Sequence, residues 1–133
     1  MQFRRNWPIA IIATALSAAA NAADDGYSTT YTTCMDQSGG VTANILNCIA
    51  DEIEQQDARL NQHYKSAMRA LSQEQQPQLR DVQRLWISFR DADCALLGNL
   101  TGGSIDAINR SSCYLDMTKK RAGDLAWLAE QGQ

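Results

Sequence analysis

The chain has 133 residues, of which 44% are hydrophobic and 20% are charged, and its 15 acidic and 12 basic side chains give a formal net charge of −3. This length supports one domain with a buried core and leaves no room for two. The acidic balance disfavours nucleic acid and anionic lipid as partners and favours a basic partner.

Residues 1–22 have the layout of a cleaved export signal. Arg4 and Arg5 form a basic head, the apolar run WPIAIIATALSAAA follows, and small residues precede the expected cleavage point. The apolar run is shorter than the ~20 residues of a membrane span, and no cysteine lies beside the cleavage point to carry lipid. We therefore expect a soluble single domain over 23–133, periplasmic or secreted, without a membrane anchor. Loss of the two arginines leaves 10 basic against 15 acidic residues, a formal charge of −5.

The cysteines are even in number and lie far apart, without the C-x-x-C pairs of zinc or thioredoxin-like redox sites. In an exported protein they predict two disulfides, for which three connectivities exist. We expect neither a metal nor a cofactor. The four residues are Cys34, Cys48, Cys94 and Cys113.

Hydrophobic spacing predicts an all-α fold, an antiparallel helical hairpin with a third helix. Residues 23–43 are rich in Gly, Ser, Thr and Asp without a helical period, so we expect an irregular N-terminal arm held by Cys34. Apolar residues recur at threes and fours over 44–71, which indicates an amphipathic helix. Ser72 and Gln75 have the spacing of a capping box, which predicts the start of a second helix.

The second helix is expected to bury one face and to end at the glycine-bearing loop 98–104. The amides of this loop could bind an anion, but a tight turn needs the same glycines and is the preferred interpretation. A third helix with weaker periodicity is predicted from about 104 to 129. The stripe expected to be buried on the second helix is Leu79, Val82, Trp86, Phe89, Asp93, Leu96 and Leu97.

A polar network is predicted between the first two helices. In an antiparallel hairpin, facing residues have numbers with a nearly constant sum, here about 147. Each set of facing residues shares one helix face. We expect an arginine to meet an aspartate carboxylate while hydroxyl and amide groups are satisfied beside an indole ring. The predicted pairs are Asp57 with Arg90, Asn61 with Trp86, and Tyr64 with Gln83.

The same register bears on the disulfides. It places Cys94 roughly 7 Å along the helix from Cys48, beyond the usual reach of a disulfide. The local pairs Cys34 with Cys48 and Cys94 with Cys113 are therefore favoured, and each closed loop stabilises the fold by ~3 kcal/mol. A shift of the turn by a few residues would change this register, so a crossed pattern joining Cys48 to Cys94 or Cys113 stays open.

Four segments carry a resemblance to a known family: CIADEIEQQDARLNQHY, QRLWISFRDADC, GGS, and a later cysteine followed by KKRAGDL. In the order and spacing of these segments, the chain resembles the LprI-like family of exported bacterial proteins. The resemblance implies a small helical, disulfide-bearing domain, and the namesake of the family is described as an inhibitor of lysozyme. That namesake is a lipoprotein, whereas this chain lacks the lipidation cysteine.

No pattern in the sequence indicates a catalytic site, so we do not expect an enzyme. The single histidine, His63, lies outside any G-x-S-x-G or H-E-x-x-H motif. Asp51, Glu52 and Glu54 lie near the start of the first helix. They are interpreted as a solvated face that complements the helix dipole or, more specifically, as a negative patch for a basic partner.

Two functional hypotheses follow. The first is an envelope binding protein whose acidic surface docks on a basic lysozyme and blocks its cleft. The acidic patch, the N-terminal arm and the loop 98–104 are alternative contact surfaces. The second is a disulfide-stapled structural, accessory or immunity-like module of the periplasm with no affinity for lysozyme.

Overall fold

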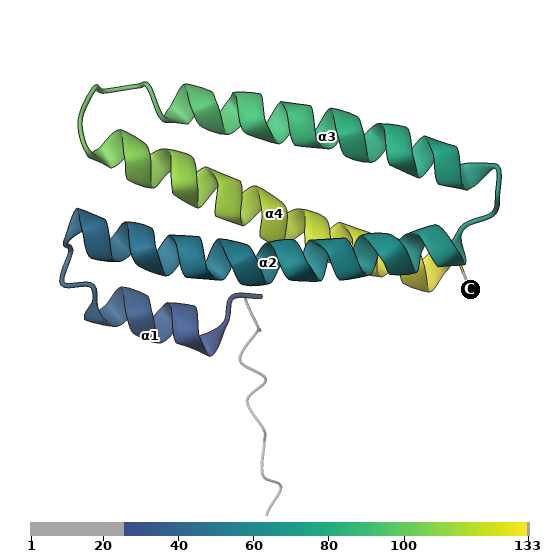
Figure 1. The fold of residues 1–133 in the computed structure, drawn as a ribbon, viewed down its shortest axis with the longest axis horizontal. Helices are drawn as coiled ribbons and strands as arrows, with labels where there is room; N and C mark the ends of the chain where they lie inside the picture. The colour runs from purple at the N-terminus through teal and green to yellow at the C-terminus, as the bar shows by residue number, and fades with distance from the viewer. Residues whose placement is uncertain (1–25, 133) are drawn as a thin grey trace, which may run out of the picture.

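The computed structural model describes residues 26–132 as four helices, and this range contains no strand (Figure 1). The expected export signal lies outside the described residues. Within the range, no helix combines the length and apolar character that a membrane crossing requires. The all-α fold and the three long helices predicted from the sequence are confirmed. The helices are α1 (Thr29–Gln37), α2 (Thr42–Ala70), α3 (Gln75–Leu97) and α4 (Ile105–Gln131).

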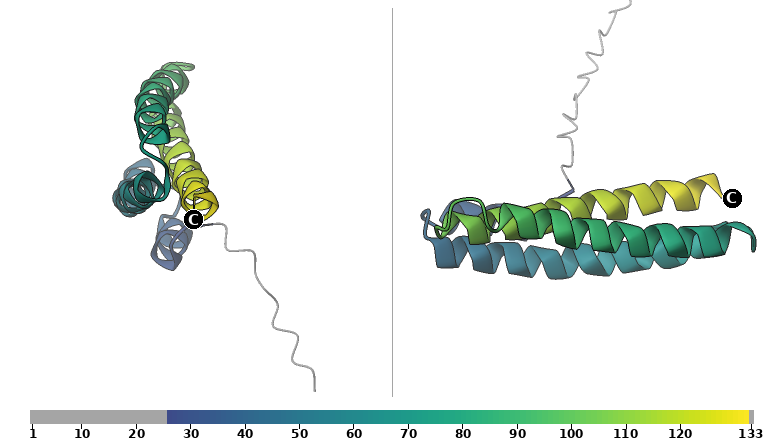
Figure 2. Two further views of the ribbon diagram at one scale, coloured as in Figure 1. Left: turned by 90° about the vertical axis from the view of Figure 1, so that its right-hand side faces the viewer. Right: turned by 90° about the horizontal axis from the view of Figure 1, so that it is seen from above.

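Helix α4 occupies the central position in the bundle. It runs alongside α2 in the same direction, while α3 runs in the opposite direction along another side of α4 (Figures 1 and 2). Extended contact joins α2 to α4 and α3 to α4, but not α2 to α3. The predicted antiparallel hairpin of the first two long helices is confirmed, since α2 and α3 run in opposite directions and a short turn joins them (Figure 1). The expectation that the two helices pack directly on each other is wrong, because α4 offers packing surfaces to both of them.

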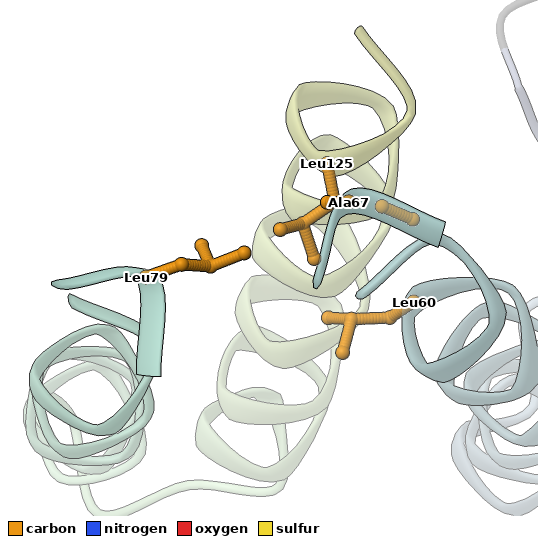
Figure 3. Close-up of a cluster of buried hydrophobic side chains, with 5 residues drawn as sticks. Leu60, Ala67, Leu79 and Leu125 are labelled. Carbon is orange, nitrogen blue, oxygen red and sulfur yellow. The ribbon is translucent and has the colours of Figure 1, made fainter. Parts of the chain in front are cut away.

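The hydrophobic core lies mainly between α2 and α4. Leu60 and Ala67 of α2 pack against Ala122 and Leu125 of α4, and Leu79 near the start of α3 joins them (Figure 3). Burying side chains of this size provides the main driving force for the fold, since each large aliphatic residue contributes about 1.5–3 kcal/mol.

The N-terminal segment is more ordered than its composition predicts. Part of the arm expected to be irregular forms α1, whose N-cap residue Ser28 accepts a hydrogen bond from the amide of Tyr31. This helix buries none of its own residues, and its many Thr residues have low helix propensity. Neither burial of its own side chains nor helix propensity therefore stabilises α1, and it depends on contacts with other helices, such as the disulfide to α2 and the contact of Tyr27 with Lys119 of α4.

The turn between α2 and α3 follows the predicted capping box. The amide of Gln75 donates to the Ser72 hydroxyl oxygen at 3.3 Å, and the amide of Ser72 donates to the Gln75 side-chain oxygen at 3.1 Å. The box satisfies the Ser72 amide and gives the Gln75 amide a second acceptor beside the Ser72 carbonyl at 3.0 Å, and the predicted start of α3 is confirmed.

Helix α3 presents a different face to the bundle from the one its apolar stripe predicts. Its buried residues include Gln83 and Arg90, whereas Val82, Phe89 and Leu96 are exposed. The expected burial of these three apolar side chains is wrong. The polar flank of α3 has partners on α4, and this orientation turns the apolar flank outward.

Candidate functional site

Two disulfides fasten the peripheral helices to the central pair. Cys34 of α1 pairs with Cys48 of α2, and Cys94 of α3 pairs with Cys113 of α4, with Cα–Cα distances of 5.7 and 5.5 Å. The local pairing favoured from the sequence is confirmed, and the crossed pattern is wrong. Each bond lies near one end of the bundle and restricts how far α1 or α3 can move from its neighbour.

Glu52 belongs to the interior and not to an exposed acidic patch. Its side chain is 1% exposed. It accepts hydrogen bonds from the amide of Ser28 at 3.0 Å, from the hydroxyl of the same residue, and from the Gln56 side-chain nitrogen at 2.7 Å. Its inclusion in a docking patch is wrong, because this carboxylate instead positions the residue that caps α1.

The other two members of the predicted acidic patch remain available at the surface. Asp51 and Glu54 are exposed on α2, three residues apart. Side chains at this spacing lie on one face of a helix. The acidic surface near the start of α2 therefore consists of this pair, flanking a buried glutamate.

Arg90 joins α3 to α4. It is 7% exposed, donates to Asp91 at 3.0 Å and to the Thr118 hydroxyl at 3.2 Å, and its guanidinium carbon lies 3.8 Å from the centre of the Tyr114 ring. No ion pair joins Arg90 to Asp57 in the described part of the chain. The predicted direct contact between them is therefore wrong. Burial raises the pKa of Asp57, and the positive charge of Arg90 offsets part of that rise.

A second guanidinium extends this polar contact along α4. Arg121 donates through Nε to the Gln83 side-chain oxygen at 2.9 Å. The Trp86 ring lies between the two arginines, with its centre 4.9 Å from the Arg90 guanidinium and 5.9 Å from that of Arg121. Nη2 of Arg121 is buried without a hydrogen-bond partner, and burial lowers the pKa of this side chain.

The six residues predicted to form one network between the first two long helices do not contact one another as one group. The three on α3 face α4, while Asn61 is exposed and Tyr64 packs against the core. The partners that sequence reasoning missed lie on α4 at intervals of four and three residues, the spacing of one helix face. A search for this polar stripe in the third helix would have found them. They are Tyr114, Thr118 and Arg121.

The loop between α3 and α4 is closed around a carboxylate of the chain itself. Asp106 accepts hydrogen bonds from the amides of Thr101 and Gly102 at 3.0 and 2.7 Å, and from the Thr101 hydroxyl at 2.9 Å. Burial alone would raise the pKa of Asp106, but these hydrogen bonds together lower it below its usual value. The amides considered for anion binding therefore already hold an internal anion, which supports the turn interpretation.

A shallow hollow of about 610 Å³ lies between α1 and α2. Hydroxyl and amide side chains line it together with one disulfide, and no titratable group contributes. Within residues 26–132, no group of His, Cys, Asp or Glu side chains has the arrangement of a metal site. His63 is half-buried on α2. The lining residues are Thr29, Thr30, Thr33, Cys34, Gln37, Ser38, Asn44, Asn47 and Cys48.

Comparison with known proteins gives one family match. A family model described as "Lysozyme inhibitor LprI" matches residues 34–125, a range that includes all four cysteines. An uncharacterized protein of Rhizobium meliloti is 33% identical over 103 residues, which cover 66% of this chain and 74% of the relative. No solved structure matches the chain.

Proposed function

Because the chain belongs to the LprI family of lysozyme inhibitors, we propose that it inhibits a lysozyme by docking on it as a folded protein. The family match over 34–125 carries this proposal, since it spans α2, α3 and most of α4 together with both disulfides. The family is one of inhibitors and not of enzymes. The action proposed is therefore to bind the enzyme and obstruct its substrate, without chemistry on the substrate itself.

Charge supports a basic lysozyme as the target. The chain carries a formal charge of −3, and −5 without the expected export signal. Opposite net charges accelerate the encounter of two proteins, and salt weakens that acceleration because it screens exposed charges beyond about 8–10 Å. Asp51 and Glu54 are exposed carboxylates that can take part in this attraction.

The scaffold suits an inhibitor that acts outside the cytoplasm. Disulfides persist in oxidising compartments, where lysozymes act on the cell wall. A preorganised surface also loses little conformational entropy on binding. We therefore propose a soluble protein, exported to the periplasm or beyond, whose two disulfides hold the binding surface in shape.

The direct test is lysozyme activity on a cell-wall suspension with increasing amounts of purified, oxidised protein, at low and at physiological salt. We expect inhibition that saturates near one equivalent per enzyme and weakens as salt rises. Absence of inhibition against several basic lysozymes would contradict the proposal. It would favour instead the structural or immunity-like module that lacks affinity for lysozyme.

A matched pair of variants locates the docking surface. Asp51→Lys with Glu54→Lys should slow association by about tenfold or more if these carboxylates steer the encounter. Glu74→Lys with Glu130→Lys makes the same change in net charge at exposed positions towards the other end of the bundle, and it should have a smaller effect. Equal effects of the two pairs would show that net charge alone acts and would remove the α2 surface from the proposal.

A further inference from the structure

Helix α3 carries an exposed row of apolar side chains on the flank that α4 does not cover. We call this row the outer seam. Its large members are 50%, 71%, 61% and 62% exposed, in chain order. Successive positions are separated by three, four, three and four residues, the a and d spacing of a helix that packs lengthwise against another helix. The outer seam consists of Val82, Leu85, Phe89, Ala92 and Leu96.

The described part of the chain leaves this seam uncovered. Gln83 and Arg90 direct the opposite flank of α3 towards α4, and α2 makes no extended contact with α3. The four large side chains expose on the order of 400 Å² of apolar surface, which is in the range of the largest patch on a typical monomer. It is also about half of the ~800 Å² that each partner contributes to a standard interface, and flanking residues would supply the rest.

We propose that the outer seam is the contact surface of a homodimer, in which α3 packs antiparallel against α3 of a second copy. A straight row at this spacing is complementary to another helix with the same spacing, because each side chain fits between side chains of the facing row. A two-fold axis near Ile87 pairs residues whose numbers sum to about 174. Leu85 then meets Phe89 of the partner subunit, and Val82 meets Ala92 of the partner subunit.

The fit of the row to itself favours the antiparallel direction. Antiparallel packing joins unlike side chains in each layer, because Leu85 meets Phe89 of the partner subunit and the larger Val82 meets the small Ala92 of the partner subunit. Parallel packing would instead place two Phe89 side chains together in one layer and two Ala92 side chains in the next, so the contact would be crowded in one place and empty in the other.

This inference does not depend on lysozyme binding. Asp51 and Glu54 belong to α2, which lies apart from the outer flank of α3 (Figure 2). A dimer formed through α3 therefore leaves both carboxylates exposed in each copy. Measurements on the protein alone test the dimer, and its failure would leave the proposed inhibition untouched.

The first experiment is sedimentation velocity of the purified, oxidised protein from about 1 µM to about 1 mM, the range in which a modest interface is populated. We expect a reversible monomer–dimer equilibrium. Leu85→Glu with Phe89→Glu should weaken dimerisation by roughly 100-fold or more, because it places four carboxylates in the centre of the contact. Both positions are exposed, so helicity by circular dichroism should stay unchanged.

The matched control is Val41→Glu with Leu100→Glu, which adds the same charge at exposed apolar residues outside α3. This control should dimerise as the unchanged chain does. The proposal is overturned if the unchanged chain stays monomeric up to about 1 mM. It is also overturned if the seam variant and the control weaken association equally.

Cross-linking tests the direction of packing. Leu85→Cys and Phe89→Cys variants are folded separately, mixed and then oxidised. Antiparallel packing predicts a disulfide-linked heterodimer from the mixture and little linkage of either variant with itself. Linkage of each variant with itself, without enrichment of the heterodimer, would overturn the antiparallel arrangement.

Discussion

The contact of α4 with α2 and its contact with α3 differ in chemistry. Towards α2, α4 buries Ala122 and Leu125 completely in an apolar cluster. Towards α3, the middle of the contact consists of Arg90 and Arg121 with their hydroxyl, amide and ring partners. Leu79 joins α3 to the core near one end, and the disulfide at Cys94 joins it near the other.

This difference indicates where the free energy of folding is concentrated. Burial of apolar surface contributes directly, whereas a buried guanidinium must recover its lost hydration through good partners before it contributes anything. Arg121 recovers it incompletely, since its Nη2 has no hydrogen-bond partner. We therefore expect α2 and α4 to form the stable part of the bundle and α3 to be the long helix that is most easily released.

The largest effect is expected from breaking the apolar contact. Leu125→Ala removes a fully buried side chain and should lower the free energy of unfolding by about 2–5 kcal/mol. Leu85→Ala makes the same chemical change at a residue that is 71% exposed and should cost less than about 0.5 kcal/mol in the monomer. Urea unfolding followed by circular dichroism, at concentrations where the protein is monomeric, measures both. Similar costs would contradict the location of the core.

Removal of the α3–α4 disulfide should come next in size. Cys94→Ala with Cys113→Ala opens a link between residues 19 positions apart and should lower stability by ~3 kcal/mol in the chain-entropy model. The informative measurement is native-state hydrogen exchange. Because polar contacts hold the middle of α3, its amides should lose protection well before those of α2. Equal loss in α2 and α3 would mean that the bundle opens as one unit.

The corresponding control removes the other disulfide. Cys34→Ala with Cys48→Ala opens a link of 14 positions, so its entropic cost should be similar. Its effect on hydrogen exchange should be confined to α1, because α1 contacts α2 and buries none of its own residues. The two double variants thus separate the loss of a cross-link from the loss of the helix that it holds.

Arg90→Ala addresses the polar contact directly. Loss of the guanidinium leaves the Thr118 hydroxyl without its donor and the Tyr114 ring without its cation, so stability should fall by about 2 kcal/mol. Arg84→Ala removes a largely exposed guanidinium from the same helix and should cost less than about 0.5 kcal/mol. If both changes cost the same, the polar contact is not what holds the middle of α3.

Sequence alone predicts where the helices of this protein lie along the chain better than it predicts which helices pack against one another. Periodicity and the Ser72–Gln75 capping box identify the three long helices, because these are local properties of the chain. Periodicity does not identify which flank of α3 is buried. Val82 and Phe89 are as apolar as core residues, yet the partners of Gln83 and Arg90 on α4 decide how the helix is turned.

The acidic surface of α2 could be predicted only in part, because the sequence shows where carboxylates lie along the helix but not which of them other helices cover. Three neighbouring acidic residues suggest one patch, but the hydrogen bonds of Glu52 with Ser28 depend on a helix that sequence pattern did not reveal. Helix α1 has no apolar stripe, so its position depends on contacts with other helices, among them the hydrogen bonds between Glu52 and Ser28 and the contact of Lys119 on α4 with Tyr27. The disulfide pairs were predicted correctly, although the register that separated Cys94 from Cys48 assumed a direct contact of α2 with α3. The conclusion survives because α4 lies between these two helices and keeps their cysteines apart (Figure 1).

The smallest effect is expected from two aspartates with opposite surroundings. Asp106 accepts hydrogen bonds from the loop between α3 and α4, and Asp57 is half-buried on α2. Hydrogen bonds lower the pKa of Asp106 in the folded protein. As the pH falls through the usual value of about 3.8, the unfolded chain therefore takes up this proton first, and the folded protein loses the stability that the carboxylate contributes at higher pH. Burial raises the pKa of Asp57, so the folded protein takes up its proton first and gains stability over the pH range just above the same value. Urea unfolding at a series of pH values from about 6 to 2 should therefore give a shallower acid loss for Asp106→Asn and a steeper one for Asp57→Asn than for the unchanged chain. If the two substitutions alter the slope in the same direction, the opposite surroundings assigned to these carboxylates are wrong.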